Sequence, residues 1–137
     1  MKRHEARTEA ISILYECEMS EENIDAVLAK RLLAGVENDD FTVRLAKGVI
    51  ENQQAIDDSI VKYAKEWKVE RMPYVDRNIL RLSMYEVMFC ADIPASVSID
   101  EAVENAKKFG GKDSAKFING VLGEMIKHNR IDEKGMS

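Results

Sequence analysis

Hydrophobic residues recur every three or four positions along most of this 137-residue chain, the spacing that gathers them on one face of an α-helix. A first set opens the chain, a second ends at Gly35, and a third runs from Phe41 to Trp67. Asn52 and the two glutamines after it interrupt the middle of the third set, so the pattern leaves open whether this segment forms one helix or two. No stretch alternates with the period of a β-strand. The pattern predicts an all-α protein.

Residues that favour helix ends divide these sets. Ser20 is expected to cap the second helix, and residues 38–40 to form the turn and cap before the third. Ser98 and Glu101 form an S-x-x-E capping box. The helix that this box begins is expected to stop at the glycine pair 110–111.

The second half of the chain supplies the centre of the predicted fold. Pro73 suits the opening turn of a helix over residues 75–90, which is apolar on most sides and is therefore expected to be buried. A last helix is expected over residues 113–129. The chain length fits one domain. The sequence thus predicts six or seven helices in a single compact domain over residues 1–130, followed by a polar tail over residues 131–137.

The net charge of −5 argues against a nucleic-acid partner until its distribution is considered. Residues 16–58 hold eleven acidic side chains and four basic ones, whereas residues 107–130 hold six basic side chains and two acidic ones. Lys2, Arg3 and Arg7 give the start of the chain a positive charge as well. Two basic ends around an acidic middle make an anionic partner plausible.

The sequence carries no signature of catalysis: it has no Gly-rich phosphate loop, no HExxH and no GxSxG. His4 and His128 lie near the chain ends, where a preorganised general base is not expected. Cys17 and Cys90 lack metal-ligand spacing, so two reduced, packed thiols are predicted. We find no secretory leader and no apolar run of membrane-spanning length. We expect a cytoplasmic protein without enzymatic activity, metal or cofactor.

The first helix shows an unusual basic pair. On a helical wheel, Arg3 and Arg7 extend the upper end of the apolar face that Ala10 and Leu14 belong to. Guanidinium groups at this place are reasonable if an anion binds there, although a solvated N-terminus explains the pair as well. Tyr15 falls about 150° from the centre of the apolar face and is expected to point outward, where it can anchor a partner.

The last helix contains a second candidate site around Phe117, which falls about 120° from the centre of the apolar face. Its neighbours on the wheel and just upstream are Asp113, Gly120, Lys116, Lys107, Lys108 and Lys112. An exposed ring beside lysines and a glycine suits base stacking combined with phosphate contacts. Packing of Phe117 against another helix is an equally good interpretation.

Four blocks of sequence are informative together: RHEAR at residues 3–7, DRNILRL at 76–82, SIDEAV at 98–103 followed by AKKFG, and DSAKFINGVL at 113–122. In this order they resemble the bacterial NusB transcription antitermination factors along nearly the whole chain. The resemblance implies an all-α domain built from two small helical bundles. It also implies binding of the single-stranded boxA element of nascent RNA, notably from ribosomal RNA operons, together with the small-subunit ribosomal protein NusE. Such a complex promotes read-through by RNA polymerase and acts indirectly with other elongation factors.

The resemblance also assigns roles to individual positions. The basic start of the chain implies phosphate contacts by Lys2, Arg3, His4 and Arg7. The last block implies RNA contacts by Asp113, Lys116 and Phe117, next to the lysines at 107, 108 and 112. The surface facing the ribosomal protein is expected to include Tyr15, Glu70 and Asp76.

Two other functions remain open. A stand-alone protein-interaction module would use the outward aromatic residues for partners alone, and a homodimer is also left open. The same helical domain occurs fused to ribosomal RNA methyltransferases, so an accessory role in RNA processing or methylation is the second alternative. The chain ends at Ser137 without a methyltransferase domain, and we expect the free-standing factor.

Overall fold

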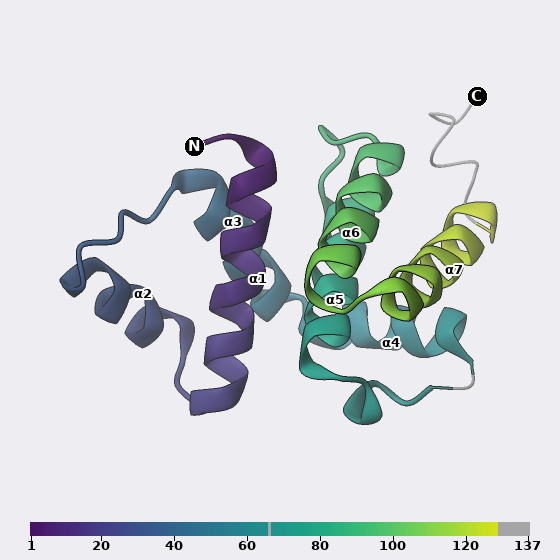
Figure 1. The fold of residues 1–137 in the computed structure, drawn as a ribbon, viewed down its shortest axis with the longest axis horizontal. Helices are drawn as coiled ribbons and strands as arrows, with labels where there is room; N and C mark the ends of the chain where they lie inside the picture. The colour runs from purple at the N-terminus through teal and green to yellow at the C-terminus, as the bar shows by residue number, and fades with distance from the viewer. Residues whose placement is uncertain (66, 129–137) are drawn as a thin grey trace.

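The computed structural model describes residues 1–65 and 67–128, which form helices and no strands (Figure 1). The elements are α1 (Arg3–Ser20), α2 (Ile24–Leu33), α3 (Asp40–Glu51), α4 (Gln53–Ala64), a short 3₁₀ turn η1 (Val69–Arg71), α5 (Tyr74–Phe89), α6 (Ala95–Phe109) and α7 (Lys112–His128). The all-α prediction is confirmed. The predicted tail over residues 131–137 lies outside the described residues.

The helices form two groups, as Figure 1 shows: α1, α2 and α3 lie on one side, and α4, α5, α6 and α7 on the other. Within the first group, α1 packs against α2 and α3. In the second, α6 packs against α5 and α7, and α4 also contacts α5 and α7. Helix α5 joins the groups because it contacts α1 and α3 as well. The expected two-bundle arrangement with a central 75–90 helix is therefore confirmed.

One hydrophobic core runs through both groups and explains why they hold together. Each long helix contributes fully buried aliphatic side chains, including Ile13, Leu45, Ile60, Leu80 and Leu122. Burying one such side chain contributes roughly 1.5–3 kcal/mol relative to leaving it in water. In the part of the chain that the structure describes, no helix combines the length and hydropathy needed to cross a bilayer.

The predicted cap of the second helix is wrong. Ser20 is the last residue of α1, and Glu21 then adopts a left-handed conformation with φ 58°. The cap of α2 is Asn23, whose side chain accepts a hydrogen bond from the backbone N–H of Ala26 at 2.9 Å. Asp39 caps α3 in the turn that the sequence predicted. Asn and Ser serve equally well as caps, so sequence alone did not distinguish them.

The predicted capping box of α6 is also wrong. Helix α6 begins at Ala95, directly after Pro94, so Ser98 and Glu101 lie inside the helix. Pro94 is the N-cap residue, with an extended ψ of 138°, and its φ of −60° is compatible with a helix that starts at the next residue. The Ser98 hydroxyl is buried and donates to Glu86 Oε1 at 2.8 Å instead. The two residues therefore serve contacts between helices.

The question of one helix or two between residues 40 and 64 is settled by Asn52, which separates α3 from α4. Its side-chain amide donates to the carbonyl oxygen of Gly48 at 2.8 Å. Gly48 is buried where α3 meets α5, and a Cβ built on it would lie 2.1 Å from Cζ of Tyr85. The Tyr85 ring packs directly on α3 because position 48 has no side chain.

We expect Gly48→Ala to lower the free energy of unfolding by about 1–3 kcal/mol, because the added methyl group overpacks the α3–α5 contact. The matched control is Gly123→Ala in α7, where the new Cβ meets no atom within 4 Å. That change should raise the free energy of unfolding by up to about 1 kcal/mol through helix propensity. Urea denaturation of both variants measures the difference, and equal effects would contradict the close approach.

Candidate nucleic-acid interface

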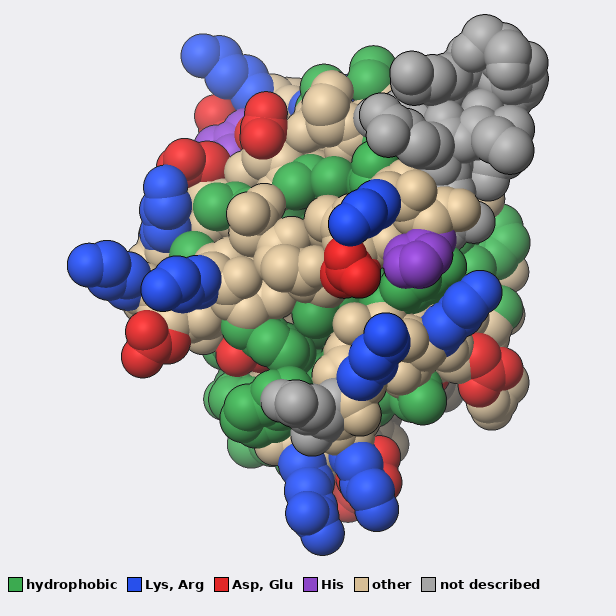
Figure 2. All heavy atoms as spheres, turned by 90° about the vertical axis from the view of Figure 1, so that its right-hand side faces the viewer, with side chains coloured by type: hydrophobic (Ala, Val, Ile, Leu, Met, Phe, Trp, Pro, Cys, Tyr) green, Lys and Arg blue, Asp and Glu red, His purple; other side chains and the backbone are tan. Residues whose placement is uncertain are grey.

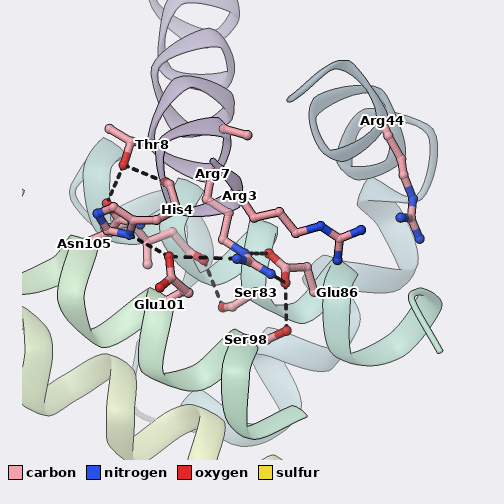
Figure 3. A network of polar contacts seen from close by, with 12 residues as sticks. Arg3, His4, Arg7, Thr8, Arg44, Ser83, Glu86, Ser98, Glu101 and Asn105 are labelled. Atoms are coloured by element: carbon pink, nitrogen blue, oxygen red, sulfur yellow. Dashed lines mark hydrogen bonds and ion pairs between the residues drawn. The ribbon is translucent and has the colours of Figure 1, made fainter. Parts of the chain in front are cut away.

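The start of α1 presents three of the predicted RNA-binding side chains to solvent. Lys2, Arg3 and His4 are all exposed. His4 Nδ1 lies 2.7 Å from Oε1 of Glu101 on α6, so the histidine side chain links the first turn of α1 to α6 (Figure 3). These three residues are placed as a surface contact with an anion requires.

Arg7 is different because it is buried between α1, α5 and α6, with 3% of its surface exposed (Figure 3). Its Nε and Nη2 donate to the two carboxylate oxygens of Glu86 at 2.8 and 2.9 Å, and Nη1 lies 3.9 Å from Glu101. Burial lowers the pKa of Arg7, but the hydrogen bonds and charges of Glu86 and Glu101 together raise it above its ordinary value. Arg7 thus anchors the start of α1, and a phosphate contact by Arg7 would have to replace Glu86.

Helices α1 and α6 lie side by side in parallel, which brings the two basic regions onto neighbouring helices. His4 meets Glu101, and one turn further the Thr8 hydroxyl donates to Asn105 Oδ1 at 3.1 Å (Figure 3). Lys108 follows Asn105 by another turn of α6. The basic start of α1 therefore lies beside the middle of α6. The predicted lysines lie further along α6, near its C-terminal end.

Three predicted lysines line an open groove between α6 and α7 with a volume of about 850 Å³. Lys107 comes from the last turn of α6, and Lys112 and Lys116 come from the first turns of α7. The other polar lining residues are Asp100, Glu104 and Asn119. Lys108 and Asp113 are exposed but do not line the groove. The groove therefore has a small excess of positive charge at its α7 side.

Phe117 does not lie in this groove. It is half-buried, and its ring packs edge-to-face on Trp67 with ring centroids 5.6 Å apart. Phe117 thus packs against a neighbouring segment while part of it stays accessible, and base stacking on it stays a prediction. Trp67 follows the end of α4 and is 50% exposed, so the larger accessible aromatic surface is that of Trp67. Sequence reasoning placed Trp67 in the core pattern and missed it.

A separate aromatic surface lies where α1 ends and α5 begins. Tyr15 is 40% exposed, which confirms that it points outward, and its ring meets Tyr74 edge-to-face at 6.0 Å. Tyr74 is equally exposed and holds the guanidinium of Arg77 4.7 Å from its ring centre. Glu70 is exposed in η1. Sequence reasoning missed Tyr74, and the signal that could have found it is an aromatic residue directly after Pro73, at the start of a helix.

Asp76 is placed differently from the other predicted partner residues, because only 7% of its surface is exposed. Its carboxylate accepts a hydrogen bond from the Ser114 hydroxyl at 2.7 Å. A Cβ added to Gly110 would lie 3.1 Å from the same carboxylate. Asp76 therefore ties the start of α5 to the turn between α6 and α7, beside the lysine groove.

The charged side chains on this side of the molecule are interleaved. Figure 2 shows Lys and Arg side chains at several places, with Asp and Glu between them, rather than one continuous basic patch.

Cys17 and Cys90 are free thiols, as predicted. No group of three or more His, Cys, Asp or Glu side chains within residues 1–65 and 67–128 is arranged to hold a metal ion.

Comparison with known proteins identifies the family. The NusB family model matches residues 4–127. The transcription antitermination protein NusB of an Exiguobacterium species is 41% identical over 129 residues, covering 94% of this chain and all of that protein. A solved structure of T. maritima NusB is 36% identical to this chain with a TM-score of 0.82, covering 93% of this chain and 92% of that one.

A second solved structure is a complex of the antitermination factors NusB and NusE with double-stranded RNA. It is 27% identical to this chain with a TM-score of 0.80, covering 93% of this chain and 99% of that chain. The family match, the curated relative and the shared fold extend over the same helices that the four sequence blocks indicated. The chain therefore belongs to the NusB family of transcription antitermination proteins, which are not enzymes.

Proposed function

We propose that this chain binds the boxA element of nascent RNA, notably from ribosomal RNA operons, together with ribosomal protein NusE. In this role it promotes read-through by RNA polymerase in the cytoplasm. The observation that carries the proposal is the likeness, over 93% of this chain, to a chain of a NusB–NusE complex with double-stranded RNA. The basic residues of α1 and of the α6–α7 groove supply the charge that such a ligand requires.

The proposed RNA path crosses two neighbouring helices. It begins on Lys2, Arg3 and His4, follows the α1–α6 side and reaches the lysines near the α6–α7 turn. Acidic side chains of α6 lie between these ends, Glu101 beside His4 and Glu104 in the groove. An RNA strand whose phosphates contact these cations at separate positions avoids the carboxylates between them. Sequence preference must then come from base contacts, because phosphate contacts position a nucleic acid without reading it.

Base stacking is assigned to the Trp67–Phe117 pair. The two rings lie edge-to-face, and half of Trp67 is exposed. Stacking of one base on such a surface contributes about 1–3 kcal/mol. Asp113 and Lys116 occupy neighbouring positions at the start of α7, where Lys116 can meet a phosphate beside a stacked base.

The proposed NusE surface is formed by Tyr15, Tyr74 and Glu70 at the junction of α1, η1 and α5. Exposed tyrosines are common anchors of protein interfaces. Asp76 contributes indirectly, because its bond to Ser114 positions the α6–α7 turn next to this surface. The ribosomal protein and the RNA would then meet at the start of α7, where both surfaces adjoin.

The proposal is tested by fluorescence anisotropy with a boxA oligonucleotide and a scrambled sequence of equal composition, each with and without NusE. We expect tighter binding to boxA, strengthened by NusE, with affinity that falls steeply between 50 and 200 mM salt, the range over which about 10³–10⁵ can be lost. Binding that ignores salt, or equal affinity for both sequences in the presence of NusE, would overturn the function.

We expect the double variant Lys112→Gln/Lys116→Gln to bind boxA RNA more weakly and with a shallower salt dependence. Loss of two phosphate contacts to a single strand lowers the slope of log K against log salt by about 1.4, or 0.7 per contact. The matched control is Lys62→Gln/Lys127→Gln, which removes two exposed lysines of α4 and of the end of α7. An unchanged slope in the first variant would exclude the groove from the RNA path.

A further inference from the structure

A cluster of arginines surrounds one aromatic ring at the α1–α3 contact, and the ring and one of the arginines belong to α3, a helix to which no RNA binding was assigned. The ring belongs to Phe41 in the first turn of α3. The Cζ atoms of Arg3, Arg7 and Arg44 lie 4.2, 5.5 and 5.8 Å from its centre. Cations are attracted to the face of an aromatic ring at these distances. Phe41 thus helps to fix three guanidinium groups close together.

The charges of this cluster are not balanced. Arg7 is neutralised by the buried Glu86. Arg3 and Arg44 share a single carboxylate, that of Asp92 in the α5–α6 connection. Asp92 receives two hydrogen bonds from Arg44, at 3.1 and 2.7 Å, whereas its nearest distance to Arg3 is 4.0 Å. One positive charge therefore remains without a counter-charge within the cluster.

The geometry at Asp92 shows what Arg44 is arranged to bind. Nη1 and Nη2 of Arg44 each donate to a separate oxygen of Asp92, the bidentate geometry that arginine uses for carboxylate and for phosphate alike. These hydrogen bonds hold the pKa of the Asp92 carboxyl below its ordinary value, so the group stays ionised. Asp92 therefore presents two anionic oxygens to Arg44, as a phosphodiester would.

The cluster is accessible to a ligand. The side chains of Arg3, Arg44 and Asp92 are 55%, 40% and 51% exposed. Figure 3 shows Arg3 extending from α1 to the side on which the Arg44 side chain hangs from α3, while Arg7 points inward to Glu86. Exposed ion pairs contribute little to stability because water competes with them. Exchange of Asp92 for another anion is therefore inexpensive.

We propose that Arg3, Arg44 and Phe41 form a phosphate-binding subsite in which the Asp92 carboxylate occupies the place of an RNA phosphate. The subsite rests on the proposed RNA binding and extends it from α1 onto α3. RNA is favoured over an acidic protein segment because Arg3 directly follows the exposed Lys2 at the proposed start of the RNA path. Asp92 acts as an internal competitor that lowers RNA affinity.

Two substitutions test the subsite with opposite expected signs. Arg44→Gln should weaken RNA binding about fivefold and lower the salt slope by about 0.7, because one phosphate contact is lost. Asp92→Asn should tighten binding about two- to fivefold, because both arginines are released from the competing carboxylate. Both effects should be the same for boxA and scrambled RNA, since a phosphate contact carries no sequence information.

The matched controls change the same charges on α4, which lies at the bottom of Figure 1, whereas the start of α1 lies at the top. Lys62→Gln removes one exposed cation, and Asp58→Asn removes one exposed carboxylate. If Asp92 only pins the α5–α6 connection to α3, then Asp92→Asn will match Asp58→Asn in RNA affinity and the proposal fails. Thermal unfolding of each variant, followed by circular dichroism, checks that all four remain folded.

A second measurement separates the subsite from the boxA function. The Nε–H resonances of Arg3 and Arg44 are followed by NMR while the uridine trinucleotide UpUpU is added to the wild type, with exposed Arg71 as reference. Shifts of both resonances support the subsite even if boxA is not preferred. Preferred boxA binding with unshifted resonances, and with Arg44→Gln equal to its control, overturns the subsite and leaves the function standing. Shifts with a polyglutamate peptide but not with UpUpU would assign the cluster to a protein partner and overturn the proposal.

Discussion

Arg7→Ala is expected to lower the free energy of unfolding by about 3–5 kcal/mol, the cost of leaving one partner of a buried ion pair alone. Glu86 is 1% exposed and receives two hydrogen bonds from Arg7 and one from the Ser98 hydroxyl. Without Arg7, its negative charge has no cation in direct contact. Urea denaturation measures the loss, and a change below about 0.5 kcal/mol, typical of surface sites, would contradict the buried pair.

The double variant Arg7→Met/Glu86→Met separates the pair from the rest of the packing. Replacing both members of a buried ion pair by apolar residues is often neutral or stabilising. The Ser98 hydroxyl then turns to the carbonyl of Pro94, one helical turn back. We expect the double variant to be markedly more stable than Arg7→Ala. Its RNA affinity shows whether Arg7 contacts phosphate, which Arg7→Ala cannot show by itself because that change also destabilises the fold.

Arg81→Ala should be the second most destabilising change, at about 2–3 kcal/mol. Arg81 is 7% exposed and donates to both oxygens of Asp57 on α4 at 2.8 and 2.9 Å, with Glu18 of α1 3.8 Å away. The expected loss is smaller than for Arg7, because the Asp57 and Glu18 side chains keep about a quarter of their surface in water and can be solvated.

The control for Arg81→Ala is Arg71→Ala, which removes an exposed arginine of η1 and should change the free energy of unfolding by less than about 0.5 kcal/mol. Comparison of the two variants at low and high salt adds a second criterion. The loss caused by Arg81→Ala should persist in 1 M salt, because partly buried pairs are screened less than exposed ones. A loss that disappears in salt would identify the pair as a surface contact.

These two arginines belong to sequence blocks that indicated function. Arg7 lies in RHEAR and Arg81 in DRNILRL, yet both guanidinium groups join helices within the fold. A resemblance weighs every matching residue alike, whether it binds a ligand or stabilises the structure. The cations that remain available to RNA are the exposed ones, among them Arg3, Lys112 and Lys116.

The helical fold could be predicted from the sequence because hydrophobic periodicity is a local property: it indicates which side of each helix is buried. That property predicted α5 as the central helix and the break near Asn52 as one of two outcomes. Exact caps were less readable, since Ser20 and Asn23 both favour helix starts, and Pro94 began α6 before the expected Ser98. The outward position of Tyr15 followed from the same periodicity.

Sequence by itself thus determined the fold class, the family and the two basic regions of the chain. Only the tertiary structure decided which charges face solvent. Glu86 lies far from Arg7 in sequence and meets it only when α5 packs on α1. Asp92 likewise meets Arg44 only when the α5–α6 connection packs on α3. The same packing set Phe117 against Trp67. Helical periodicity describes one helix at a time, whereas ion pairs and aromatic contacts between helices depend on how the helices are placed relative to one another.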